Sequence, residues 1–363
     1  MRNALFGADH TRSTRRRLGA LVVAGALTVG LAACGAPPGA AGDGEVKDAG
    51  QPLKLGISMP QLDNQFFNVL VDDATKAAEA AGGSVVQTTD AKHDAGQQVT
   101  DFRNLISAGS NAILAGIVDT KAIKPALDYA ASQGVPVVIV DDQPTGGAVA
   151  AVVKADNIKM ANAAAETLGS LIPNGGKVLE ISGDPATTNG RDRNTGFDDV
   201  MKSKYSNIEL ITQTAKWDGA TAGTVASAIL SQNPDLAGIY LATDTLYLEP
   251  VSATLAGRGD LAPAGDPNHV PMVAIDGGAA ALKAIKAGTL DATISQPVDL
   301  YAKYGVQYLQ DARAGKTLAT GATEHDSTVV QDGEYLVDLL PAPVVTQANV
   351  DDPALWANSG GSQ

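Results

Sequence analysis

The stretch LKLGISMPQLDNQFF, residues 53–67, decides the fold. Its first part, 53–59, is a short and mostly apolar run. A polar turn follows, and an amphipathic segment then covers 67–80. A brief apolar run followed at once by a helical pattern is typical of a parallel strand that is buried on both faces and covered by a helix. The stretch therefore predicts a βα unit with polar and aromatic side chains at the carboxyl end of its strand.

The same alternation continues along the chain and then starts again. Further strands are expected at 84–88, 112–117, 135–140, 178–182, 210–214, 239–242 and 273–275. Further helices are expected at 96–107, 121–133, 194–204, 221–232, 245–255, 279–287 and 300–314. Alternating strands and helices imply right-handed crossovers and a doubly wound parallel sheet. Because the pattern restarts after residue 155, the sequence predicts an α/β fold of two such lobes.

The N-terminus has the pattern of an export signal. Arginines at 12, 15, 16 and 17 precede an uncharged run, 18–33, which is shorter than the roughly 20 residues of a spanning helix. The run ends in LAAC, which resembles the signal of bacterial lipoproteins. We therefore expect 1–33 to be a signal peptide, Cys34 to carry a lipid that anchors the exported chain to the outer face of the cell membrane, and 34–52 to be a flexible tether. An ordinary signal peptide beside an unmodified thiol is the alternative, and both the general and the twin-arginine export routes fit.

Composition excludes several classes of function. The chain has 363 residues, of which 44% are apolar and 18% charged, so it can fold as two domains. Its net charge of −14 argues against nucleic acid as a partner. The four histidines follow no metal-binding spacing, and no phosphate-binding loop is present. The sequence predicts no metal, no cofactor and no enzymatic activity, with glycoside hydrolysis by the adjacent Asp141 and Asp142 as an alternative.

Polar or aromatic side chains follow nearly every expected strand. In two α/β lobes these positions face the crevice where ligands bind. Hydroxyl groups of a sugar pair well with carboxylates, amides and guanidinium groups, and its C–H faces stack on aromatic rings. A sugar or polyol held between the lobes is therefore the predicted ligand. The candidate ligand-binding residues are Asn64, Phe66, Phe67, Asp141, Asp142, Arg191, Trp217, Thr243, Asp276 and Gln296.

Simpler interpretations remain open for some of these residues. Phe66 and Phe67 could begin a helix and fill the core. Asp276, followed by Gly277, could be the N-cap of the next helix, because aspartate is favoured there. Arg191 could belong to a solvated loop.

Residues 53–330 resemble the ribose-binding type of periplasmic sugar-binding proteins of ABC transporters, known as type 1 periplasmic binding proteins. The motifs that carry the resemblance are Asn64-Gln65-Phe66-Phe67, Arg191-Asp192-Arg193 with Gly196-Phe197, Asp276-Gly277 and the segment 292–296. The resemblance implies that Arg191 touches the sugar, that Trp217 stacks on it, and that Asp276 holds two hydroxyls. It also implies that Gln296 contacts the ligand beside a hinge.

The resemblance further implies two lobes joined by three crossings of the chain, near Asp156, Gln296 and Asp326. The first lobe would then be 53–155 with 297–325, and the second 156–296 with 326–350, followed by a loose tail at 351–363. Such a protein closes on its ligand by hinge bending and delivers it, as a monomer, to the membrane subunits of an ABC transporter. A sugar sensor that docks on a signalling protein would use the same site. A DNA-binding repressor is excluded, because the signal peptide and tether stand where its helix-turn-helix would be.

Three positions depart from the ribose-binding pattern. Asp142 stands where the family usually has Arg, and Gly116 and Thr243 stand where the ribose-binding pattern has Asn. These departures argue against ribose itself. A carboxylate in place of a guanidinium makes the site richer in acceptors, which favours a ligand with more donors, such as an acyclic polyol, an inositol or an amino sugar.

Overall fold

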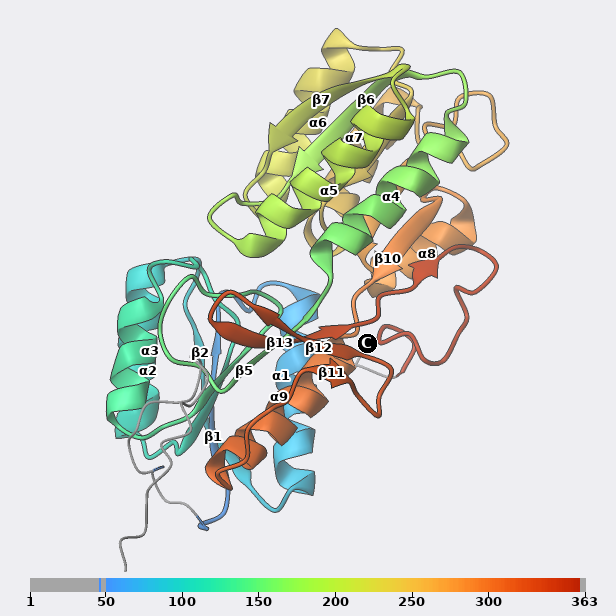
Figure 1. Cartoon of the computed structure of the whole chain (residues 1–363). Helices are drawn as coiled ribbons and strands as arrows, with labels where there is room; N and C mark the ends of the chain where they lie inside the picture. The colour runs from blue at the N-terminus through green and yellow to red at the C-terminus, as the bar shows by residue number, and fades with distance from the viewer. Residues whose placement is uncertain (1–45, 47–49, 360–363) are drawn as a thin grey trace, which may run out of the picture. The chain divides into compact units, whose positions relative to one another are not determined.

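A computed structural model describes Val46 and residues 50–359. The expected signal peptide, Cys34 and most of the expected tether lie outside these residues. The described chain is a mixed α/β structure with two sheets in which parallel pairs predominate (Figure 1), so the predicted fold class is confirmed. Within the described residues, no helix combines the length and the apolar character needed to cross a bilayer.

The first sheet and its helices form the first lobe. The order of its strands is β11-β12-β13-β5-β4-β3-β1-β2, and all pairs from β13 to β2 are parallel. Helices α1 and α9 cover one face and α2 and α3 the other (Figure 1). The strands are β1 Lys54–Met59, β2 Ser84–Asp90, β3 Ala112–Ala115, β4 Val137–Val140, β5 Ala151–Ala155, β11 Gly321–Ala322, β12 Thr328–Asp332 and β13 Tyr335–Leu340, and the helices are α1 Gln65–Ala80, α2 Ala95–Ser107, α3 Lys124–Ser132 and α9 Val298–Arg313.

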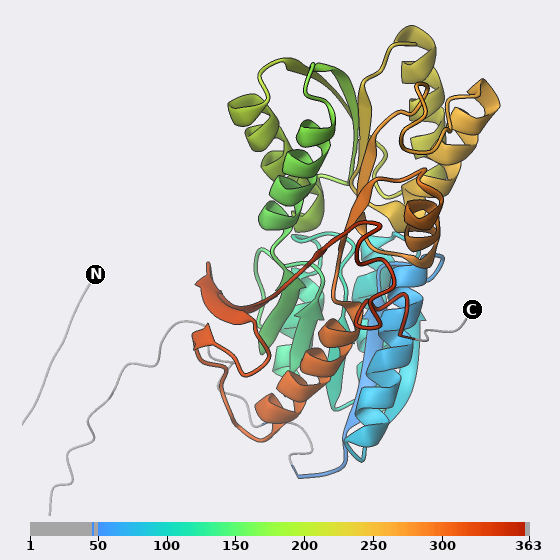
Figure 2. The same cartoon turned by 90° about the vertical axis from the view of Figure 1, so that its right-hand side faces the viewer.

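The second sheet and its helices form the second lobe. The order of its strands is β14-β10-β9-β8-β6-β7. Within the described part of this sheet, only the β10–β14 pair is antiparallel. Helices α4 and α5 cover one face, and α6, α7 and α8 the other (Figure 2). The strands are β6 Gly176–Ser182, β7 Ile208–Thr214, β8 Gly238–Leu241, β9 Met272–Asp276, β10 Ala292–Ser295 and β14 Val344–Val345, and the helices are α4 Asn157–Leu171, α5 Thr188–Lys204, α6 Gly219–Gln232, α7 Asp244–Arg258 and α8 Ala279–Ala287.

Helix starts are fixed by side chains that lie just after the strands. Asn64 caps α1 by accepting a hydrogen bond from the backbone N–H of Phe66, and Thr187 caps α5 by accepting one from Gly190. Asp218 caps α6 through the N–H of Thr221. Because each cap satisfies backbone groups that the helix leaves unpaired, it fixes where the strand-to-helix loop ends. The loops that face the crevice are therefore held at both ends by regular structure.

Seven of the described elements were not expected from the sequence: β5, α4, β10, β11, β12, β13 and β14. Strand β5 and helix α4 both lie between 140 and 178, where neither was predicted. Helix α4 reads NIKMANAAAETLGSL, and three of its seven buried residues are alanines and a fourth is a glycine. Such a face is small and does not stand out as an apolar stripe, which explains the omission of α4.

The end of the chain needs two corrections. The third crossing lies between Leu340 and Val344 rather than near Asp326, because β12 and β13 form a hairpin and β13 pairs with β5 at the edge of the first sheet. Residues 328–340 therefore belong to the first lobe. The expected loose tail is also wrong for its described part, since Leu355 and Trp356 are buried.

Candidate functional site

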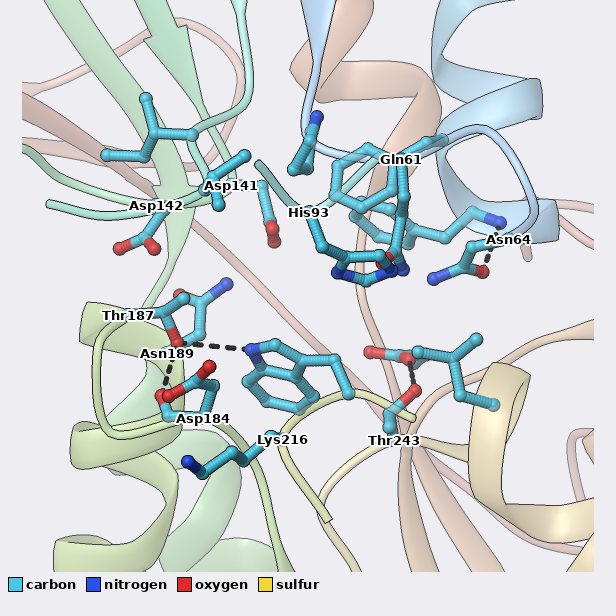
Figure 3. Close-up of a pocket in the computed structure, with 18 of the residues that line it drawn as sticks. Gln61, Asn64, His93, Asp141, Asp142, Asp184, Thr187, Asn189, Lys216 and Thr243 are labelled. Atoms are coloured by element: carbon cyan, nitrogen blue, oxygen red, sulfur yellow. Dashed lines mark hydrogen bonds between the residues drawn. The ribbon is translucent and has the colours of Figure 1, made fainter. Parts of the chain in front are cut away.

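A cavity of about 340 Å³ lies between the carboxyl ends of the strands of both sheets (Figure 3). Its volume falls in the range of small-molecule sites. Gln61, His93 and Asp141 of the first lobe face Thr187, Asn189 and Thr243 of the second across it (Figure 3). The lining residues are Pro60, Gln61, Asn64, Phe66, Phe67, His93, Ile117, Val118, Asp141, Asp142, Asp184, Thr187, Asn189, Arg193, Lys216, Trp217, Asp218, Thr243, Leu246, Asp276 and Gln296.

The cavity brings together nine of the ten residues that the sequence singled out. Six different loops or strand ends supply them, so residues more than 200 positions apart meet at one place. Contact of each with a ligand stays a prediction. The nine residues are Asn64, Phe66, Phe67, Asp141, Asp142, Trp217, Thr243, Asp276 and Gln296.

Arg191 is the exception, and Arg193 lines the cavity in its place. Helix α5 begins at Thr188, so both arginines lie on a helix rather than in a loop. Residues two apart on a helix point to nearly opposite sides. Arg191 is exposed and donates hydrogen bonds to Pro185 O at 2.8 Å and to Thr188 Oγ1 at 3.1 Å. Arg193 is 2% exposed.

Asp276 is held by four hydrogen-bond donors. Its Oδ1 accepts from Arg193 Nη1 at 3.2 Å and from Gln296 Nε2 at 2.7 Å. Its Oδ2 accepts from the hydroxyls of Thr243 and Thr245. Two donors on each oxygen occupy the acceptor capacity of a carboxylate and fix its direction. The N-cap interpretation is wrong for this residue, because Gly278 is the N-cap of α8 and that helix has no side-chain cap.

Arg193 is the central cation of the site. It donates from Nε to Asn157 Oδ1 at 2.7 Å and from Nη1 to Ala242 O at 2.6 Å, besides its ion pair with Asp276. Burial lowers the pKa of the guanidinium, but the carboxylates of Asp276 and Asp141 outweigh burial and raise it overall. The guanidinium also lies 5.7 Å from the centre of the Trp217 ring, a cation–π arrangement. Arg193 therefore ties several strand ends of the second lobe together.

Asp141 has a different environment from Asp276. Its side-chain Oδ1 is buried and has no hydrogen-bond partner among the described residues. Burial raises the pKa of this carboxyl to about 7, against the lowering effect of Arg193 and with a further rise from Asp142. A buried acceptor without a partner is costly unless something pairs with it. Asp141 is therefore the carboxyl of the cavity that a ligand hydroxyl would satisfy.

Asp142 connects the two lobes. Its Oδ1 accepts from the backbone N–H of Gln143 at 2.7 Å and from that of Thr188, in the second lobe, at 3.0 Å. The hydroxyl of Thr188 in turn donates to Gln143 O at 3.1 Å. Thr188 is the first residue of α5, so the carboxylate lies at the positive end of that helix. One of the two carboxylate oxygens of Asp142, Oδ1, is thus already used by protein donors.

The aromatic residues serve both core and cavity. Phe66 and Phe67 are buried in the main hydrophobic cluster, with ring centres 5.1 Å apart and an edge-to-face arrangement. A Cβ on Gly116 would lie 3.2 Å from Cε1 of Phe67, so the glycine leaves room for that ring. Gly183 does the same for Trp217, whose ring would be 2.0 Å from an added Cβ. Phe66 and Phe67 thus fill the core and also line the cavity, and their contact with a ligand stays a prediction.

Unusual backbone conformations concentrate at this cavity. Seven described non-glycine residues have a positive φ angle, and five of them line the cavity: His93, Asp141, Lys216, Trp217 and Asp276. Such conformations cost about 1–3 kcal/mol each and cluster at functional sites. Sequence reasoning considered His93 only as a metal ligand and did not single out Lys216. The one available signal was their position just after β2 and β7.

The described residues contain no group of three or more His, Cys, Asp and Glu side chains placed to hold a metal ion.

The family model for a periplasmic binding protein domain matches residues 55–317. The chain belongs to the periplasmic binding protein family. This binding protein is 30% identical over 263 residues to the ribose import binding protein of Bacillus subtilis, covering 72% of this chain and 82% of that relative.

Two further comparisons agree with this assignment. The D-ribose/D-allose-binding protein of Pseudomonas aeruginosa is 29% identical over 300 residues, covering 80% of the binding protein and 89% of the relative. The solved structure of an ABC transporter solute-binding protein from Mycobacterium smegmatis with bound glycerol has a TM-score of 0.72 and 27% identity, covering 83% of this chain and 96% of that one. The predicted membership among type 1 periplasmic sugar-binding proteins is confirmed, and the family consists of transport binding proteins, not enzymes.

Proposed function

We propose that this chain is the solute-binding lipoprotein of an ABC importer, which captures a sugar or polyol in the cavity and delivers it to the membrane permease. The observation that carries the proposal is a cavity lined by both lobes, in which Asp276 is fixed by four donors and Asp141 offers an unpartnered acceptor. Relatives named for ribose and allose, and one solved with glycerol, support this ligand class.

The cavity offers the groups that a polyhydroxylated ligand needs. Asn64, Asn189 and Asp141 present amide and carboxylate groups, while the rings of Phe67 and Trp217 offer apolar surface. Leaving a buried hydroxyl unpaired costs roughly 1–3 kcal/mol, so such a lining selects one arrangement of hydroxyls over another. Arg193 takes the place proposed for Arg191, because its side chain lines the cavity.

Capture by hinge closure follows from where the lining residues lie. The chain passes three times between the two sheets, and the cavity receives side chains from both lobes. A ligand that contacts both halves stabilises the closed arrangement, because the contacts to one half are lost when the lobes separate. We propose that the permease recognises the closed form of a monomeric binding protein.

The proposed lipid anchor on Cys34 rests on the LAAC sequence alone. Growth of the native host with an alkyne-labelled palmitate should label the wild-type chain, and Cys34→Ser should abolish labelling and release the protein from the membrane fraction. Labelling that persists in Cys34→Ser would contradict the anchor.

A thermal-shift screen tests the ligand class. The chain is heated with pentoses, hexoses, inositols, amino sugars and linear polyols, with amino acids as a class of different chemistry. A ligand at about 100 times its dissociation constant adds roughly 2.7 kcal/mol of stability, which raises the melting temperature. Arg191→Ala is the matched control and should keep the shift, whereas Arg193→Ala should lose it. A shift with amino acids and none with any sugar or polyol would refute the proposal.

A further inference from the structure

The C-terminal segment 350–359 returns to the second lobe after β14. Val350 and Leu355 are buried in the same hydrophobic cluster as Leu282 and Ile285 of α8. Lys286 Nζ pairs with Asp351 Oδ1 at 2.6 Å. We call residues 350–359 the C-terminal brace. Its packing anchors it to the second lobe.

Trp356 of the brace contacts a cavity-lining residue of each lobe. Its Nε1 donates to the backbone carbonyl of Asp276, in the second lobe, at 2.9 Å. Its ring meets Phe66, in the first lobe, edge to face with ring centres 6.4 Å apart. Trp356 is 2% exposed and does not itself line the cavity. It therefore lies directly behind two residues that face the ligand space.

The Asp276 contact supports an unfavourable backbone conformation. Asp276 has a φ of 120°, outside the region that non-glycine residues prefer. Its carbonyl accepts both from Trp356 Nε1 and from the N–H of Gln296 at 3.0 Å. These two hydrogen bonds hold the peptide in the orientation that directs the Asp276 carboxylate to Arg193.

The Phe66 contact reaches the hinge. Phe66 also meets Tyr301 edge to face, with ring centres 6.2 Å apart. The Tyr301 hydroxyl accepts from the N–H of Ala155 at 2.6 Å and donates to Gln296 Oε1 at 2.8 Å. Ala155 and Gln296 border the first two crossings of the chain between the sheets. The row Trp356–Phe66–Tyr301 thus joins the brace to both crossings.

We propose that Trp356 is a positioning residue that favours the closed arrangement of the lobes and aligns Phe66 and Asp276 for the ligand. The brace is anchored to one lobe, whereas Phe66 belongs to the other, so separation of the lobes strains or breaks the Trp356–Phe66 contact. The part of the inference that concerns ligand affinity rests on the proposed function, whereas the part that concerns closure does not.

The distance between the lobes tests the proposal without any ligand. Spin labels are placed on the exposed positions Ser132 of α3 and Ser203 of α5 in the full chain, with Cys34→Ser so that only the two new thiols react. Pulsed dipolar spectroscopy should give a longer and broader distance distribution in Trp356→Ala than in the parent. A distribution identical to that of the parent would overturn the proposal.

Leu355→Ala is the matched control for loss of stability. Leu355 is buried in the same brace but packs only in the second-lobe cluster. Both substitutions should lower the melting temperature, and only Trp356→Ala should change the interlobe distance. Equal changes in both variants would mean that unfolding of the brace, and not Trp356, is responsible. Trp356→Phe retains a ring against Phe66 but removes the donor to Asp276. Its interlobe distance distribution should therefore lie between those of the parent and Trp356→Ala.

Affinity for D-ribose and D-allose is the second measurement. For whichever probe binds the parent, Trp356→Ala should raise the dissociation constant about tenfold, and Leu355→Ala by less than about twofold. If neither probe binds the parent, the choice of these two sugars is at fault, and the interlobe distance still decides the role of Trp356.

Discussion

The two halves of the cavity differ in how many of their polar groups are already paired. In the second lobe, Asp276 accepts four hydrogen bonds and Arg193 donates three. In the first lobe, Asp141 Oδ1 is also buried but has no partner among the described residues. The polar groups of the second half are therefore paired within the protein, while the first half keeps an acceptor for the proposed ligand. Pairing in advance reduces the ordering cost of binding, and unpaired acceptors give selectivity.

The largest expected effect comes from breaking the paired half. Arg193→Ala leaves the buried carboxylate of Asp276 without its cation, and removal of one member of a buried pair costs about 3–5 kcal/mol. We expect a strongly lowered melting temperature and loss of ligand binding. Chemical denaturation and ligand titration of the variant measure both.

Arg191→Ala is the control for this prediction. Arg191 is on the same helix but exposed, so its removal should change the free energy of unfolding by about 0.5 kcal/mol or less. A similar loss in the two variants would show that the second half is not organised around Arg193.

A smaller effect is expected at Asp142, where the two halves meet. Asp142→Arg removes the acceptor of the Thr188 N–H and places a cation at the positive end of α5. A hydrogen bond to a charged group contributes about 1.5–3 kcal/mol, so ligand affinity should fall about tenfold or more. Isothermal titration with the ligand found in the thermal screen measures the change. Gln143→Ala is the control, because Gln143 contacts Thr188 through its backbone carbonyl. Tighter binding by Asp142→Arg would contradict this role.

The smallest effect is expected at Asp141, in the half of the cavity that has an unpaired acceptor. Asp141→Asn removes the ionisable group whose Oδ1 lacks a partner, so we expect weaker ligand binding together with a more stable ligand-free protein at alkaline pH. The gain in the free energy of unfolding should be roughly 1–3 kcal/mol, the cost of one unsatisfied buried group. A variant less stable than the wild type above about pH 8 would show that Asp141 is paired after all.

The pH dependence of this gain follows from the direction of the pKa shift. Burial raises the pKa of Asp141 from 3.8 to about 7, so the folded state holds this proton more tightly than the unfolded state. The stability contributed by the protonated form is present at acid pH and is lost as the pH rises toward 7. The advantage of Asp141→Asn should therefore grow between about pH 4 and pH 7 and then level off. Glu180 and Asp244, whose pKa values are also raised to about 7, titrate in both proteins, so only the difference between them is informative.

Much of the fold could be predicted from the sequence, because each buried parallel strand is a continuous apolar run bounded by polar strand ends. Elements that were not predicted have weaker hydrophobic patterns, such as the buried face of α4, which is made mostly of small residues. The hairpin 328–340 was assigned to the wrong lobe for another reason. Its residues form strands that either lobe could accept, and only the pairing of β13 with β5 decides the lobe.

Prediction of the cavity-lining residues succeeded where position after a strand decides the matter, as for Asp276 and Trp217, whereas their contact with a ligand stays a prediction. It failed at Arg191 because the choice between two arginines depends on where α5 begins. Positions two residues apart on a helix point to nearly opposite sides, so only one of the two arginines can face the cavity. Trp356 could not be found at all, since nothing in the sequence near it shows that the chain end returns to Asp276.

The positive φ angles around the cavity bear on how this protein could acquire a new ligand. At His93, Asp141, Lys216, Trp217 and Asp276 the positive φ angle sets the direction in which the Cα–Cβ bond leaves the main chain. Glycine, asparagine and aspartate tolerate such a backbone, whereas valine, isoleucine and threonine do not. A mutational library restricted to the tolerated residues at these positions would therefore change what the cavity recognises while keeping its geometry, and the β-branched variants would be lost at the folding step.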